Sequence, residues 1–281
     1  MSKQPKKDQG MPPVPAGFQM PFYYASLVNC AMYFPADPGV LSPYLKGKFV
    51  RPALFDGQGL VYFNYQLYTA HFPGFMSLVT EIELNIVSYP VAREREVPRL
   101  TLREFVAGED QTKLYGNLRV HVPCDNPQAI KAGVELFGEP KFQTTFNASL
   151  PSLNDPTVET WTVICNDPGA ADPSKDDGGY IFKAVADLRG LGASAGNVSP
   201  TTEYGIVGGR LIGARWNILE PHRTYFLDPK QAKRVAMTYG ASQHQMRKDM
   251  QALIGKTPCA AVQTFDSKPA AVQSRAYYAD V

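Results

Sequence analysis

Seven segments of the chain alternate apolar and polar residues with a period of two, which is the pattern of a β-strand with one buried face. They lie at residues 60–70, 78–91, 113–123, 141–150, 159–166, 179–188 and 208–221. Loops, rather than regularly spaced helices, join most of these segments. This order favours a mainly antiparallel sheet, closed or sandwiched, over a doubly wound parallel fold.

Three segments carry helix signals. Residues 37–47 form a short candidate helix, and a longer one is capped by Asn126 and ends at Gly138. Residues 228–255 are helical in composition, with a break expected near Gly240. The chain is therefore expected to be α+β, with few helices.

We predict one domain over residues 18–281, because no long linker or internal repeat divides the chain. The 281 residues are 44% hydrophobic and 19% charged, which is enough apolar material for a real core. Residues 1–17 are polar and rich in proline, and we expect them to be a disordered tail.

Charge and composition argue against several classes of partner. The net charge is +2 with acids and bases interleaved, so neither nucleic acid nor a membrane surface is an expected partner. No run of about 18 apolar residues could span a membrane. The four cysteines are scattered and no apolar signal segment is evident, so we expect free thiols in the cytoplasm. The four histidines are isolated, and we expect no metal site.

Lys141 follows Pro140 at the start of an apolar strand, in the stretch GVELFGEPKF. A free lysine has a pKa of about 10.4, so at neutral pH its ammonium group cannot attack a carbonyl carbon. Burial alone can lower the pKa of a lysine by about three to five units. Lys141 is then either a strand-end lysine that reaches solvent or an amine placed as a chemical site.

That stretch resembles the GRE-x-x-x-x-PKK signature of the acetoacetate decarboxylase superfamily, in which the first lysine forms a Schiff base with a keto acid. MYFPADPGVLSPYL (32–45) is similar to the Y-x-x-D-x-x-x-L-x-x-x-L opening of the family, and LVTEIEL (78–84) to its Y-x-E strand. The resemblance extends over about residues 22–146 and is weak beyond residue 200.

The resemblance implies a mainly antiparallel β-barrel or cone, flanked by a few helices, with the pocket inside. It makes Lys141 the Schiff-base nucleophile, Glu81 the acid/base carboxylate and Glu135 the glutamate of the GRE stretch. It also implies a homo-oligomer that needs no metal or organic cofactor. Without it, Glu81 and Glu135 read as residues of solvated surfaces.

The departures from the family pattern mark a diverged member. Phe142 replaces the second lysine, Leu27 falls near the arginine that holds the substrate carboxylate, and Asn64 replaces a glutamate. Glu139 stands where the family often has an aromatic residue, and could equally be a turn residue. Acetoacetate decarboxylase is itself the familiar example of a lysine activated by desolvation or by a neighbouring cation. With Phe142 in place of that cation, the sequence predicts activation of the amine by desolvation alone.

A substrate carboxylate would need another cation, and the candidates are Arg51, Arg119, Arg210 and Arg215. Of these, Arg210 is the predicted carboxylate-binding residue, because two glycines precede it and allow close approach. Tyr62 and Asn64 share one side of their strand and could line the pocket or pack in the core.

The predicted function is a Schiff-base lyase acting on a keto acid or a related carbonyl compound. Decarboxylation of a β-keto acid larger or more apolar than acetoacetate ranks just ahead of aldolase–dehydratase chemistry at the same imine. An alternative of another class is a protein that binds an apolar small molecule without turnover. Phe142, Leu27 and Asn64 fit that alternative, because each lowers the polarity or charge of the pocket.

Overall fold

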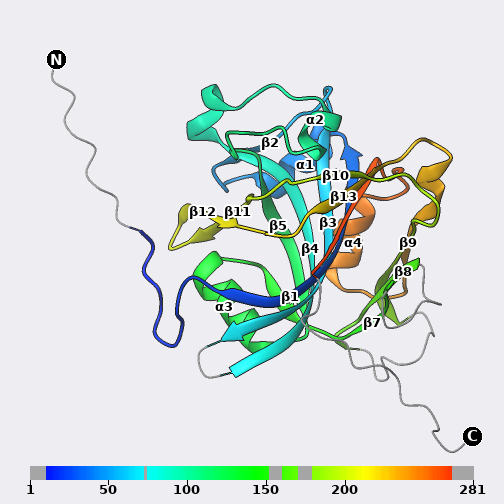
Figure 1. The fold of residues 1–281 in the computed structure, drawn as a ribbon. Coiled ribbons are helices and arrows are strands. Elements are labelled where there is room, and N and C mark those ends of the chain that lie inside the picture. Colours follow the sequence, from blue (N-terminus) through cyan, green and yellow to red (C-terminus); the bar gives the residue numbers. More distant parts are fainter. Residues whose placement is uncertain (1–10, 73–74, 152–159, 170–178, 268–281) are drawn as a thin grey trace, which may run out of the picture.

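The computed structural model describes residues 11–72, 75–151, 160–169 and 179–267. Within them, an eleven-stranded sheet and a four-stranded sheet form most of the structure (Figure 1). The larger sheet comprises β1 (Tyr23–Ala36), β2 (Val50–Pro52), β3 (Gly59–Phe72), β4 (Phe75–Pro90), β5 (Gly116–Cys124), β6 (Lys141–Gln143), β10 (Ser194–Gly196), β11 (Thr201–Val207), β12 (Arg210–Trp216), β13 (His222–Phe226) and β15 (Ala261–Asp266). The smaller sheet comprises β7 (Phe146–Ser149), β8 (Thr160–Asn166), β9 (Tyr180–Asp187) and β14 (Val235–Tyr239). The α-helices are α1 (Pro38–Leu45), α2 (Leu102–Val106), α3 (Pro127–Phe137) and α4 (Gln245–Leu253), and short 3-10 helices span Val91–Glu96 and Gln231–Arg234.

The larger sheet is mixed but mainly antiparallel. Its order is β10-β13-β15-β1-β3-β4-β5-β11-β12, and β2 and β6 pair with β4 and β5. Only the pairs of β5 with β6 and with β11 are parallel. The predicted α+β class, with a mainly antiparallel sheet and few helices, is confirmed. The strand order of the described residues does not close on itself, so closure into a barrel is not confirmed.

The central strands β1, β3 and β4 have two chemically different faces. One face is apolar and packs on the smaller sheet, where the ring of Phe63 meets that of Phe182 edge-on at 5.4 Å between centroids. Burying each such side chain stabilises the fold by about 1.5–3 kcal/mol. The opposite face carries buried polar side chains at the centre of the sheet. There Gln66 of β3 pairs in register with Glu81 of β4. Buried polar groups need partners, so this face is where a functional site is expected.

Helix α3 is set by its caps as predicted. The side-chain oxygen of Asn126 accepts hydrogen bonds from the backbone N–H groups of Gln128 and Ala129, at 3.0 and 3.1 Å. The helix ends at Gly138, which has a left-handed conformation with φ of 62°. This end of α3 packs tightly on β11.

The segment 228–255 differs from its prediction. Only α4, after His244, is an α-helix, and residues 235–239 form β14. The sequence VAMTY there contains β-branched and aromatic residues, and its pairing with β9 outweighs the helical composition of the segment. The predicted strand 141–150 is also divided, because β6 joins the larger sheet and β7 the smaller one.

The predicted N-terminal tail lies partly outside the described residues, because the description begins at residue 11. Residues 11–17 contain no helix or strand. The segment that follows passes beside α3 (Figure 1), where Phe22 contacts Phe137 with 6.4 Å between ring centroids. In the described part of the chain, no helix is long and apolar enough to cross a membrane.

The close approach of α3 and β11 gives a test of the fold. A Cβ atom at Gly205 would overlap the carbonyl oxygen of Phe137, so Gly205→Ala should push the helix off the strand. We expect it to destabilise the protein by about 1–3 kcal/mol, as overpacking does, measured by chemical denaturation. Gly192→Ala is the control, because a Cβ atom there meets no atom within 4 Å. Equal midpoints for the two variants would contradict the packing described.

Candidate active site

A cavity of about 510 Å³ opens on the polar face of the larger sheet. Its walls come from β3, β4 and β5, from α3, from β11 and β12, and from the N-terminal residues 11–14. Six ionisable side chains of the cavity form one cluster, which consists of Lys141, Arg119, Glu81, Glu83, Glu139 and Glu203.

Lys141 is the first residue of β6, and its side chain is only 5% exposed. The ammonium group donates to Glu81 Oε2 at 2.6 Å and to the carbonyl oxygen of Ala129 at 3.2 Å. Glu139 Oε2 lies 3.1 Å from the same nitrogen. Helix α3 leaves room for this arrangement at Gly133, where a Cβ atom would lie 2.6 Å from Lys141 Cδ.

Arg119 on β5 is the second buried cation, with a side chain 5% exposed. Its guanidinium group contacts Glu83 Oε1 at 3.2 Å, Glu139 Oε1 at 3.3 Å and Glu203 Oε2 at 2.5 Å. Glu139 therefore lies between the two cations and joins them into one network.

The carboxylates hold Lys141 in its charged form. Burial lowers the pKa of Lys141, but the negative charges of Glu139 and Glu81 outweigh burial and leave its pKa above that of free lysine. The prediction of an amine activated by desolvation alone is therefore wrong for this arrangement. The apolar neighbours of Lys141 in the sequence favour a lowered pKa, whereas the two carboxylates that contact it in the folded chain raise the pKa.

Three glutamates of the cluster differ in pKa because their environments differ. Burial raises the pKa of Glu81 above its usual range, although Lys141 opposes the shift. Burial also raises the pKa of Glu203, to about 8, against the opposing charge of Arg119. For Glu139 burial acts in the same direction, but Arg119 and Lys141 outweigh it and lower the pKa. At neutral pH Glu203 is thus mostly protonated and Glu139 is a carboxylate.

The structure brings together three of the predicted site residues, Lys141, Glu81 and Glu139. It places Glu135 on the exposed side of α3 and Arg210 at an exposed position of β12, and neither lines the cavity. The prediction that Arg210 faces the pocket is therefore wrong. Arg119, another of the four candidate arginines, is the buried arginine of the site.

Phe142 lies on the other side of β6 from Lys141, because successive side chains of a strand point to opposite faces. Its ring packs against His244, with 4.4 Å between ring centroids, and it does not line the cavity. The sequence interpretation that placed this phenyl ring in the pocket is therefore corrected.

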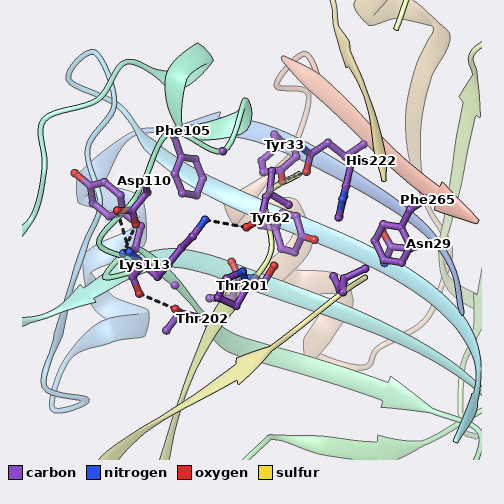
Figure 2. A pocket seen from close by; sticks show the side chains of 18 residues that line it. Asn29, Tyr33, Tyr62, Phe105, Asp110, Lys113, Thr201, Thr202, His222 and Phe265 are labelled. Atoms are coloured by element: carbon purple, nitrogen blue, oxygen red, sulfur yellow. Dashed lines mark hydrogen bonds between the residues drawn. The ribbon is translucent and has the colours of Figure 1, made fainter. Parts of the chain in front are cut away.

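Three further predicted residues lie on the polar face but outside this cavity. Leu27 is buried in a small apolar cluster with Tyr68. Asn64 of β3 accepts a hydrogen bond from Asn29, and it pairs in register with Glu83 of β4. Tyr62 lines a second, smaller cavity of about 60 Å³ (Figure 2).

Sequence reasoning did not single out Glu203, Gln66 and Tyr68 as cavity residues. The hydroxyl of Tyr68 donates to Glu81 Oε2 at 3.1 Å. The alternation of β3 carried a signal for Gln66, since it lies on the same face as Asn64. Nothing in the local pattern of β11 connected Glu203 to Lys141. Within the described residues, no group of three or more His, Cys, Asp or Glu side chains is arranged to hold a metal ion.

In fold, the chain is similar to acetoacetate decarboxylase-like enzymes. No protein-family model matches the sequence, and the search of curated proteins found no match. The solved structures do match in fold. The enduracididine biosynthesis enzyme MppR, complexed with the condensation product of pyruvate and imidazole 4-carboxaldehyde, aligns with a TM-score of 0.59 at 11% identity, over 89% of this chain and 87% of that chain.

Two further structures resemble the chain. An acetoacetate decarboxylase-like enzyme from Sphingomonas wittichii RW1 aligns with a TM-score of 0.53 at 12% identity, over 87% of this chain and 88% of its own. Acetoacetate decarboxylase from Legionella pneumophila aligns with a TM-score of 0.50 at 12% identity, over 95% and 94%. At such identities the likeness establishes the fold, and the resemblance read from the sequence is confirmed at that level.

The raised pKa of Glu203 predicts a pH-dependent stability. Unfolded glutamate has a pKa of about 4.3, so between about pH 4.5 and 8 the folded state binds a proton that the unfolded state lacks. This contribution to stability is complete below the unfolded pKa and is lost as the pH rises through about 8. Glu203→Gln should therefore remove up to about 1.4 kcal/mol per pH unit from the slope of unfolding free energy over that window.

Chemical denaturation at a series of pH values measures this slope. Glu135→Gln, at the exposed position on α3, is the matched control and should keep the wild-type slope. A Glu203→Gln slope equal to that of the wild type would show that the proton is held elsewhere.

Proposed function

We propose that the protein is a lysine Schiff-base lyase that acts on a small carbonyl compound, with Lys141 as nucleophile and Glu81 as its proton acceptor and donor. The observation that carries the proposal is the buried 2.6 Å hydrogen bond from Lys141 Nζ to Glu81 Oε2, at the wall of a cavity of about 510 Å³. The likeness in fold to acetoacetate decarboxylase-like enzymes supports it.

Glu81 supplies the step that the charged lysine needs. Its raised pKa makes it a stronger base than a free glutamate, and it is already hydrogen-bonded to the ammonium group. Transfer of one proton to Glu81 leaves the Lys141 nitrogen with a lone pair. That pair forms the C–N bond while the C=O π electrons move to oxygen. The oxygen takes two protons, the one held by Glu81 and one from the Lys141 nitrogen, and leaves as water while the remaining nitrogen lone pair forms the C=N bond. The product is a protonated imine.

The imine then accepts electrons from a breaking C–C bond and becomes an enamine. In retro-aldol cleavage the β-hydroxyl proton goes to Glu81, whereas in decarboxylation the fragment lost is CO₂. Either enamine takes a proton on carbon and is released by water. Aldolase–dehydratase chemistry is the better supported of the two, because Arg119 already contacts three carboxyl groups in place of a substrate carboxylate. Decarboxylation of an apolar β-keto acid is the second candidate.

Borohydride trapping tests the nucleophile. Incubation with a panel of keto acids, ketones and aldehydes should give a reduced adduct that mass spectrometry maps to Lys141, and Lys141→Ala should abolish it. Because the neutral amine attacks and the pKa of Lys141 is raised, the trapping rate should rise with pH through the neutral range. Lys131→Ala, which removes an exposed lysine of α3, is the control and should trap as the wild type does. Binding of the same compounds without any adduct would favour the non-catalytic binder.

The role of Glu81 has its own test. Glu81→Gln keeps the shape of the side chain but cannot take a proton, so the trapping rate should fall by roughly 10²- to 10⁴-fold. Glu135→Gln should leave the rate unchanged, since its side chain is outside the cavity. If Glu81→Gln folds normally and traps at the wild-type rate, another group transfers the proton.

A further inference from the structure

We infer that the carbonyl compound taken by the Lys141 cavity is uncharged and carries no carboxylate, and that its apolar body lies against the wall formed by the N-terminal segment and α3. The inference rests on the proposed Schiff base at Lys141. It concerns the part of the substrate that remains outside the new C–N bond.

The charges of the cluster disfavour an anionic substrate. Four carboxyl groups face two buried cations, and even with Glu203 protonated the acids outnumber the cations by three to two. Imine formation gives no extra positive charge, because a protonated imine replaces an ammonium group at the same place. A carboxylate attached near the imine carbon would therefore enter a buried region in which carboxyl groups already outnumber the cations.

Neither buried cation is available to bind such a carboxylate. Arg119 contacts three carboxyl groups, of which Glu83 and Glu139 are themselves buried. The three polar contacts of the Lys141 ammonium group go to Glu81, Glu139 and Ala129.

Arg215 is the third cation among the described residues that line the cavity. It is exposed on β12, whereas the Lys141 side chain is 5% exposed. The positive charge of Arg215 helps burial to lower the pKa of Lys113 and opposes the effect of burial that raises the pKa of Tyr204. Neither residue lines this cavity. A carboxylate bonded next to the imine carbon must lie near Lys141 Nζ, so we expect no contribution from Arg215 to its binding.

One part of the cavity wall is apolar and suits an uncharged body. Met11 and Val14 from the N-terminal segment, Phe22, Phe137 of α3, and Ile212 and Trp216 of β12 line it. Met11 is 94% exposed and Val14 48%, so a ligand seated there would remove apolar surface from water.

Matched pairs of compounds test both parts of the inference. Phenylpyruvate and its methyl ester share one carbon skeleton and differ in the charge, and methyl pyruvate lacks the phenyl ring. Each is trapped with borohydride on the wild-type protein, and each rate is divided by the rate of the same compound with Nα-acetyl-lysine, which corrects for intrinsic reactivity. We expect the phenylpyruvate ester to label Lys141 about tenfold faster than phenylpyruvate and several-fold faster than methyl pyruvate.

Two variants identify the origin of the preference. Glu83→Gln removes one of the carboxyl groups that contact Arg119 and should narrow the ratio of the ester rate to the acid rate, whereas Arg215→Ala should leave it unchanged. Equal or faster labelling by phenylpyruvate would overturn the inference, as would a ratio that depends on Arg215. These results leave the Schiff base intact. The absence of any adduct at Lys141 from all three compounds would instead overturn the proposed function, and the inference with it.

Discussion

Burying a lysine and an arginine in a protein is costly unless each charge keeps its partners, and removing one partner leaves an uncompensated charge. Lys141 and Arg119 meet this condition by sharing Glu139, which contacts both. The shared carboxylate ties β5 to the turn between α3 and β6. Glu81 and Glu203 complete the network from β4 and β11, so four separate parts of the sequence must be in place before both cations have their partners.

The two faces of the central sheet make this network possible. The apolar face of β1, β3 and β4 packs on the smaller sheet and supplies the stability of the core. The other face can then carry glutamates and amides whose desolvation is offset locally by the two cations. The parallel pairing of β6 with β5 places Lys141 beside Val122, three residues from Arg119 along β5, so the strand register brings the two cations into one site.

Local patterns predicted what depends on local chemistry. The caps of α3, the strands β3, β4, β8 and β9 and the position of Lys141 after the α3 turn followed from sequence. Strand alternation could also have placed Phe142 on the face away from the cavity, since it directly follows Lys141 in a strand. The acidity of Lys141 and the contacts of Arg119 and Glu203 were not predictable in this way, because they arise from pairings between segments such as β5 and β11. The strand at 235–239 was missed for the same reason.

Gly133 links the helix to the chemistry in a way that bears on how this sequence can change over evolution. The space that its missing Cβ leaves is filled by the aliphatic part of Lys141 and by the Glu139 carboxylate. Positions 133 and 141 are therefore expected to covary among relatives of this fold. A chain that retains the lysine must retain the glycine, whereas one that has replaced the lysine with a small residue is free to carry alanine on the helix. The pair would then distinguish sequences that keep the reactive amine from those that keep only the scaffold.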